Sequence, residues 1–304
     1  MKTLTAPVTA SNLTAWFVSI PPGEKIPDYT VLEEAMEAQT GFLHETGDVN
    51  ELLIENSGDL DLFIQAGDIV KGGRQDRTLG ADFIVPAKSG KVPIPVFCVE
   101  AARWHKREKE SDAQFSKSTN FTASKKMRAA IQQSKSQGEV WASVEEEQTK
   151  MSASLGCSIK ACVSPSSLQL SYENTEVTSA LNDYLDNLES APTPESVGVI
   201  WAINGKLSHA DIYGGPALFR KVWKKLLQAA AYEAIGERSG SESALPSDIA
   251  KVSAWLEESA PAPSEEEHLP PRTRLSTRRA NSQLRFETHD TSVADPIHLS
   301  ILAQ

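Results

Sequence analysis

Residues 197–213 read VGVIWAINGKLSHADIY and form the strongest local fold signal in the chain. The apolar run 197–203 is followed by Asn204-Gly205, the preferred pair for a two-residue type I′ turn because both residues tolerate positive φ. Residues 207–213 then return as a second strand. The stretch therefore predicts an antiparallel β-hairpin with Asn204-Gly205 at its tip.

The segments after this hairpin predict helices first and strands at the end. Two glycines precede a helix from Pro216 to about Ile235, with the proline at the first helical position, where its missing N–H costs nothing. A second helix is predicted at 247–257. Residues 259–272 are rich in Pro and Glu and predict a flexible surface loop. Strand character returns in the tail, 273–304, which we expect to pair back into the sheet.

The first part of the chain, 1–104, has a β-rich pattern. Short runs of branched and aromatic residues, as at 13–20 and 94–99, are separated by Gly, Asp and Asn in combinations typical of tight turns. Such strands favour an antiparallel sandwich or a barrel-like sheet. Residues 122–258 are richer in helical periodicity. These patterns predict an α+β fold: an N-terminal antiparallel β unit, a helical middle, and a C-terminal hairpin with packed helices, in one compact domain over 1–258.

Composition narrows the range of partners and compartments. The chain has 304 residues, 30 of them basic and 41 acidic, and so a formal charge of −11, which repels nucleic acid and anionic membrane surfaces. No run approaches the ~20 apolar residues of a membrane span. The odd number of cysteines, three, fits a reducing compartment, and the N-terminus lacks the apolar core of a signal peptide. We therefore expect a cytoplasmic protein.

A dense polar motif lies at residues 67–77, GDIVKGGRQDR. Its paired glycines allow positive φ or a close approach to a ligand, and its two arginines can grip phosphate or carboxylate bidentately. One interpretation is a small anion-binding corner; the other is a strand–turn–strand corner in which Asp76 pairs with an arginine. Neither a Walker loop nor a dinucleotide-binding glycine motif is present. The ligand-binding candidates in this motif are Lys71, Gly72, Gly73, Arg74, Gln75 and Arg77.

A second polar stretch, residues 98–104 (CVEAARW), ends the next predicted strand pair. Cys98 is interpreted as a buried structural cysteine, because a nearby carboxylate raises a thiol pKa and no histidine is tied to it by sequence. Glu100 is either half of an ion pair with one of the arginines or a general base, and Asp76 is the second acid/base candidate. Arg103 and Trp104 complete the ligand-binding candidates, with Trp104 either stacking on a base or sugar or packing in the core.

The sequence carries no metal signature. Cys157 and Cys162 have no second Cys or His pair at ligand spacing, and the six histidines are scattered singly. We therefore predict neither a metal nor a cofactor.

Three stretches together resemble a known family. They are ENSGDLDLFIQAGDIVKGGRQDR at 55–77, VPIPVFCVEAARW at 92–104, and the hairpin with its following helix at 197–234. They are similar to the ARG-and-rhodanese-phosphatase-superfamily-associated protein domain, a prokaryotic family of unsettled function. Its association with ADP-ribosylglycohydrolases and rhodanese-type phosphatases implies a role near NAD, ADP-ribose or phosphorylated-nucleotide metabolism.

Two hypotheses for function follow, and the sequence does not choose whether the protein is an enzyme. In the first, the protein binds or processes a phosphate-bearing nucleotide or an ADP-ribose-like small molecule. In the second, it is a non-catalytic interaction or scaffold protein with a protein partner, and its polar motif is a buried structural network. The position of Arg74, Arg77 and Glu100, in an open cleft or buried, distinguishes the two.

Overall fold

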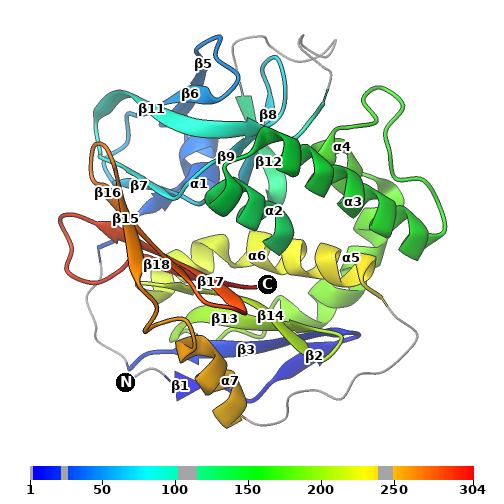
Figure 1. Ribbon diagram of the computed structural model, residues 1–304. Coiled ribbons are helices and arrows are strands. Elements are labelled where there is room, and N and C mark those ends of the chain that lie inside the picture. Colours follow the sequence, from blue (N-terminus) through cyan, green and yellow to red (C-terminus); the bar gives the residue numbers. More distant parts are fainter. Residues whose placement is uncertain (1–2, 22–26, 102–114, 239–248) are drawn as a thin grey trace. The chain divides into compact units, whose positions relative to one another are not determined.

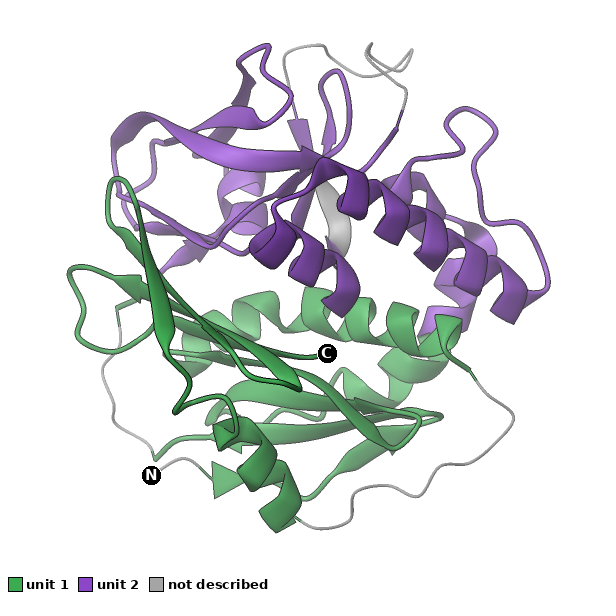
Figure 2. Ribbon diagram, in the orientation of Figure 1, with its two compact units in different colours: residues 1–28, 182–304 green, residues 29–181 purple. Residues whose placement is uncertain are grey.

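The computed structural model describes residues 3–21, 27–101, 115–238 and 249–304. The chain divides into two compact units, unit 1 with residues 1–28 and 182–304, and unit 2 with residues 29–181 (Figure 2). The sequence predicted one compact domain over 1–258. The difference arises from long-range pairing that local patterns do not contain, since strands from the N-terminus join the sheet of the C-terminal half.

In the described part of unit 1, nine strands form one antiparallel sheet in the order β1-β3-β13-β14-β18-β17-β16-β15, with β2 paired to β3 (Figure 1). The strands are β1 (Thr3–Leu4), β2 (Val8–Ala10), β3 (Leu13–Ser19), β13 (Ser196–Ile203), β14 (Lys206–Tyr213), β15 (Ser264–Leu269), β16 (Thr273–Arg279), β17 (Gln283–Asp290) and β18 (His298–Ala303). The tail strands β17 and β18 lie in this sheet, because β18 pairs with β14.

The predicted hairpin is confirmed. Strands β13 and β14 pair antiparallel, and both turn residues have positive φ, 49° at Asn204 and 74° at Gly205. The Asn204 side chain also donates to the carbonyl of Glu237 at 2.7 Å, while its oxygen accepts from Asn12 at 3.1 Å. The asparagine therefore supplies both the turn conformation and an anchor for the end of the next helix.

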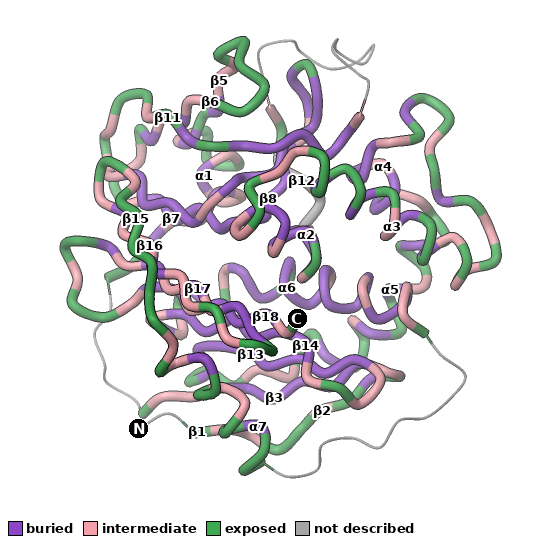
Figure 3. Tube along the Cα trace, viewed as in Figure 1, coloured by how far each residue is buried: buried purple, intermediate pink, exposed green. Residues whose placement is uncertain are grey.

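Helices cover both faces of this sheet. The helix α6 (Pro216–Gly236) packs Trp223 parallel to Trp201, with ring centroids 5.7 Å apart, while α7 (Ile249–Glu257) places Val252 in a cluster with Trp16 and Ile200. Because adjacent residues of a strand point to opposite faces, covering both faces buries a strand completely. Every residue of β13 is accordingly buried (Figure 3).

The Pro- and Glu-rich segment predicted to be a flexible loop instead contains β15, whose side chains are mostly exposed at the edge of the sheet. Cross-strand ion pairs explain the difference. Glu266 lies 3.5 Å from Arg274, and Glu265 lies 3.5 Å from Arg279, both on β16. Composition alone predicts a solvated chain for the three glutamates, whereas arginines diagonally across on β16 complement the charge of two of them.

Unit 2 contains two further sheets. One has six strands in the order β12-β8-β9-β11-β6-β5, and the other has three strands in the order β10-β7-β4. Among the described strands of the three-stranded sheet, β4 pairs parallel with β7 and β10 pairs antiparallel with β7. The strands are β4 (Thr30–Val31), β5 (Gly41–Glu45), β6 (Glu51–Asn56), β7 (Leu62–Ile64), β8 (Asp68–Gly72), β9 (Arg77–Leu79), β10 (Phe83–Val85), β11 (Ser89–Cys98) and β12 (Phe115–Thr122). The predicted α+β class, with an antiparallel β unit before a helical middle, is confirmed.

The helical middle follows β12. Its elements are α2 (Lys125–Ala129), the π-helical turn η1 (Ala130–Ser134), α3 (Gln137–Leu155), α4 (Leu168–Tyr172) and α5 (Thr175–Leu188), and the short helix α1 (Leu32–Glu37) lies earlier in the chain. Ser136 caps α3 by accepting from the N–H of Glu139, and Gly156 ends it in the left-handed conformation. The boundary between the units falls inside α5. Among the described residues, no helix combines the length and the apolar character that crossing a membrane requires.

Candidate functional site

The glycine pair of the polar motif forms the turn between β8 and β9. Gly72 and Gly73 have φ of 119° and 56°, a region that favours glycine. A Cβ at Gly73 would lie 2.5 Å from Oε1 of Glu45 and 2.6 Å from Cζ of Phe115, so these two side chains would have to shift. The carboxylate of Asp76 closes the turn by accepting from the N–H of Gly72 at 3.1 Å. The positive φ of both residues is thus sufficient to explain the glycines without a ligand.

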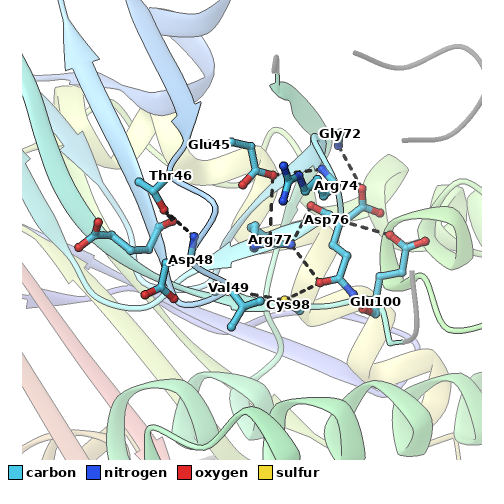
Figure 4. Close-up of polar contacts among 12 residues, drawn as sticks. Glu45, Thr46, Asp48, Val49, Gly72, Arg74, Asp76, Arg77, Cys98 and Glu100 are labelled. Atoms are coloured by element: carbon cyan, nitrogen blue, oxygen red, sulfur yellow. Dashed lines mark hydrogen bonds and ion pairs between the residues drawn. The ribbon is translucent and has the colours of Figure 1, made fainter. Parts of the chain in front are cut away.

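The two arginines of the motif lie in different environments. Arg74 is exposed, and its backbone N–H donates to Oε1 of Glu45 at 3.1 Å. Arg77 is fully buried, donates from Nη1 to the carbonyl of Gln75 at 3.1 Å, and places Nη2 4.0 Å from Glu45 (Figure 4). Gln75 is itself buried. The two guanidinium groups therefore differ in access to solvent.

The structure brings the two acid/base candidates together. The carboxylate of Glu100 accepts from the backbone N–H of Asp76 at 3.3 Å (Figure 4). The backbone carbonyl of Glu100 accepts from the side-chain amide of Gln75 at 2.9 Å. Both carboxylates are completely buried. Asp76 and Glu100 are named the carboxylate pair below.

Sequence reasoning made no assignment for the turn that receives this pair, residues 164–167, named the serine turn below. Ser164 donates to Oε1 of Glu100, and Ser167 donates to Oδ2 of Asp76 at 3.0 Å. Between them, Ser166 donates to the carbonyl of Ala101 at 2.7 Å. The signal that points to this turn is the run Ser164-Pro165-Ser166-Ser167, which combines turn and N-cap chemistry.

The remaining binding candidates are dispersed. Lys71 is half-buried, and its ammonium donates to both carboxylate oxygens of Glu173 at 2.8 Å. Arg103 and Trp104 lie outside the described residues. The described residues contain no group of three His, Cys, Asp or Glu side chains that could hold a metal ion.

Cys98 occupies a structural position. It is 2% exposed, its thiol donates to Oε1 of Gln75 at 2.9 Å, and its backbone N–H and C=O both bond to the side chain of Gln137 at 2.8 Å. Burial raises the pKa of its thiol; the carboxylates of Glu45 and Glu100 raise this pKa further, while Arg77 opposes them. A neutral, enclosed thiol is a poor nucleophile.

Thiol titration checks this assignment. Because Cys98 is buried while Cys157 is half-buried and Cys162 exposed, we expect two thiols of the native protein to react rapidly with an aromatic disulfide reagent. The third should react only after unfolding in guanidinium chloride. Cys98→Ala should keep both fast thiols and lose the slow one, whereas three fast thiols in the native wild type would contradict the burial of Cys98.

A pocket of about 480 Å³ lies in unit 2 between α3 and the serine turn. Trp141, at its edge, is 38% exposed. The residues that line the pocket are Ala101, Gly138, Trp141, Ala142, Val144, Glu145, Gln148, Lys160, Pro165 and Ser166. We call it the α3 pocket. Sequence reasoning missed it because it followed the apolar side of α3, whereas Trp141, an aromatic residue next to that side, was the available signal.

The α3 pocket has the composition of a small-molecule site. Its volume falls within the ~300–1,000 Å³ typical of ligand pockets, and it combines an aromatic ring with one cation, one carboxylate and a hydroxyl. The carboxylate pair and Arg77 are not among its lining residues. The sequence-predicted motif therefore lies behind one wall of the pocket, where the serine turn separates the two.

Fold and site define an α+β protein with two β-rich units and a small-molecule-sized pocket supported by a buried carboxylate–serine network. The chain belongs to the family described as ARG and Rhodanese-Phosphatase-superfamily-associated Protein domain, whose sequence profile matches residues 3–301. The resemblance read from the three sequence stretches is thereby confirmed. No curated protein and no solved structure matches the chain.

Proposed function

We propose that the protein binds a phosphate-bearing nucleotide or an ADP-ribose-like small molecule in the α3 pocket. The single observation that carries the proposal is the co-location of Trp141, Glu145 and Lys160 around one cavity of about 480 Å³. Family membership supports it only by association, through the enzyme classes in the family description.

Each of these side chains suits one part of a nucleotide. An exposed indole offers a face on which a base stacks, a contact worth ~1–3 kcal/mol per base in single-strand binding proteins. The ammonium of Lys160 complements a phosphate as a point charge. Glu145, one helical turn beyond Trp141, presents acceptor oxygens to ribose hydroxyls on the same face of α3. The net charge of −11 disfavours binding of polyanions, but it does not prevent one small anion from binding beside the cation of Lys160.

Within this proposal, the Lys71–Arg77 corner supports the site and does not contact the ligand. The full burial of Asp76, Arg77 and Glu100 favours this role. The same burial also favours the second candidate function, a non-catalytic interaction protein with a structural polar network. The two candidates differ in whether the α3 pocket is occupied by a small molecule.

A thermal-shift and calorimetry series with AMP, ADP-ribose, NAD and inorganic phosphate tests the proposal. A nucleotide at 100 times its Kd should add about 2.7 kcal/mol to the stability of the folded protein. Trp141→Ala and Lys160→Gln should each weaken nucleotide binding about tenfold or more, because each removes a direct contact.

Lys150→Gln is the matched control. Lys150 is an exposed lysine of α3, the helix that carries Trp141. It pairs with Glu146 and does not line the pocket, so its replacement should leave the affinity for the nucleotide unchanged. Absence of binding by every compound would overturn the proposed function. Binding that both pocket variants leave intact would place the ligand elsewhere.

A further inference from the structure

The serine turn is held at both ends by buried carboxyl groups. Ser164 donates to Glu100, and Ser167 donates to Asp76, so the first and last residues of the turn are each tied to one member of the carboxylate pair. The middle residues, Pro165 and Ser166, line the α3 pocket. The turn thus has one side on the buried network and the other on the cavity.

Backbone groups tie the same layers together. The N–H of Val99 donates to the carbonyl of Asp76 at 3.1 Å, which connects the end of β11 to the β8–β9 turn. The N–H of Leu168 donates to the carbonyl of Val99 at 3.2 Å, which connects the start of α4 to the same strand end. Contiguous backbone hydrogen bonds therefore link the β8–β9 turn, the end of β11 and the start of α4.

The opposite wall of the pocket also holds the turn. Gln148 of α3 is 1% exposed, and its amide donates to the carbonyls of Pro165 at 3.1 Å and Ser167 at 3.3 Å, and to the hydroxyl of Ser171 at 2.8 Å. Gln148 itself lines the pocket. The separation between α3 and the serine turn, which sets the width of the cavity, is therefore fixed from both sides.

We infer that Asp76 and Glu100 are positioning residues that set the geometry of the α3 pocket through Ser167 and Ser164. Carboxylates suit this task because they only accept hydrogen bonds when ionised, and bonds to a charged acceptor are roughly twice as strong as neutral ones. This inference rests on the proposed function for its ligand, but its structural part stands without one. It assigns the polar motif at residues 67–77 a role that needs no contact with the ligand.

Alanine substitutions of the two serines test the inference. Ser164→Ala and Ser167→Ala each free one end of the turn by removing one donor to a buried carboxyl group, so each should weaken AMP binding about tenfold. In ligand-free protein labelled with 5-fluorotryptophan, each should also shift the ¹⁹F resonance of Trp141, which Trp141→Phe assigns.

Two further variants separate positioning from general loss of structure. Ser143→Ala removes a buried hydroxyl of α3 that bonds to the carbonyl of Glu139 and does not line the pocket, so it should change neither readout. Ser167 also caps α4 by accepting from the N–H of Leu170. Ser167→Thr keeps the hydroxyl and the cap, and should keep AMP affinity within about threefold.

The two readouts distinguish the possible failures. If wild-type protein binds no nucleotide, the proposed function fails, while the ¹⁹F shift of ligand-free Trp141 still decides the positioning role. If both serine variants leave the Trp141 resonance and the AMP affinity unchanged, the positioning inference is overturned. If Ser143→Ala produces the same changes as the serine-turn variants, the effect is one of general packing and the inference is equally overturned.

Discussion

Arg77→Ala is expected to lower the free energy of unfolding by about 3–5 kcal/mol, the range for removing one member of a buried, partnered charge set. Arg77 is fully buried, donates to the carbonyl of Gln75 at 3.1 Å and lies 4.0 Å from Glu45, whose side chain is only 11% exposed. Truncation removes the cation beside that carboxylate and leaves a void the size of the arginine side chain beyond Cβ. Urea unfolding of both proteins, with unchanged m values, measures the difference.

Arg74→Ala is the matched control, the same substitution three positions earlier in the same motif. Its side chain is exposed, and the hydrogen bond to Glu45 comes from its backbone N–H, which alanine retains. Its cost should therefore stay within about 0.5 kcal/mol, as for surface positions. Equal losses from the two variants would contradict the difference in burial. If both variants instead kept their stability and lost phosphate affinity together, the anion-binding interpretation of the motif would regain support.

The local features of the fold were predictable because short-range chemistry decides them. Asn204-Gly205 requires no distant partner to favour its turn, and Pro216 marks a helix start wherever the chain goes next. The β-rich first part and the helical middle follow from side-chain periodicity in the same way. These signals were enough for the fold class.

The division into units was not predictable, because it depends on pairing across the chain. Strand β3 pairs with β13, so that Trp16 lies opposite Ile200, and no feature near residue 16 identifies that partner. The strand β15 was missed for a related reason, since the arginines that complement its glutamates lie on the next strand. The composition of a segment indicates how well that segment is solvated, but it does not indicate which distant strand pairs with it.

In the candidate site, too, the sequence indicates which chemistry a residue can perform but not where in the fold that residue lies. The motif at 67–77 was correctly recognised as dense in polar groups, but burial decides between anion contact and a structural network, and burial is a tertiary property. Asp76 and Glu100 do meet, through the backbone of Asp76 and the serine turn. The serines that complete the network come from a segment far along the chain that lacks any hydrophobic period.

Gly198→Ala is expected to destabilise the protein by about 3 kcal/mol, the upper end of ordinary overpacking costs. Gly198 lies in β13, paired with Ile212 of β14 on one side and Val18 of β3 on the other. A Cβ there would lie 2.6 Å from the carbonyl oxygen of Asp211 and 2.7 Å from Cα of Ile212. These are backbone atoms within a paired strand and cannot rotate away, so the two strands must separate. Urea and thermal unfolding measure the loss.

The sign of the effect makes this substitution informative. Alanine restricts the unfolded chain more than glycine does, and at a strand position with space it stabilises by about 0.4–1 kcal/mol. Gly90→Ala supplies that comparison, because a Cβ at Gly90 has no neighbour within 4 Å and its φ is not in the left-handed region. Gly90→Ala should therefore be neutral or slightly stabilising, while Gly198→Ala is clearly destabilising. A stabilising Gly198→Ala would show that β13 and β14 do not approach as closely as the register of their pairing requires.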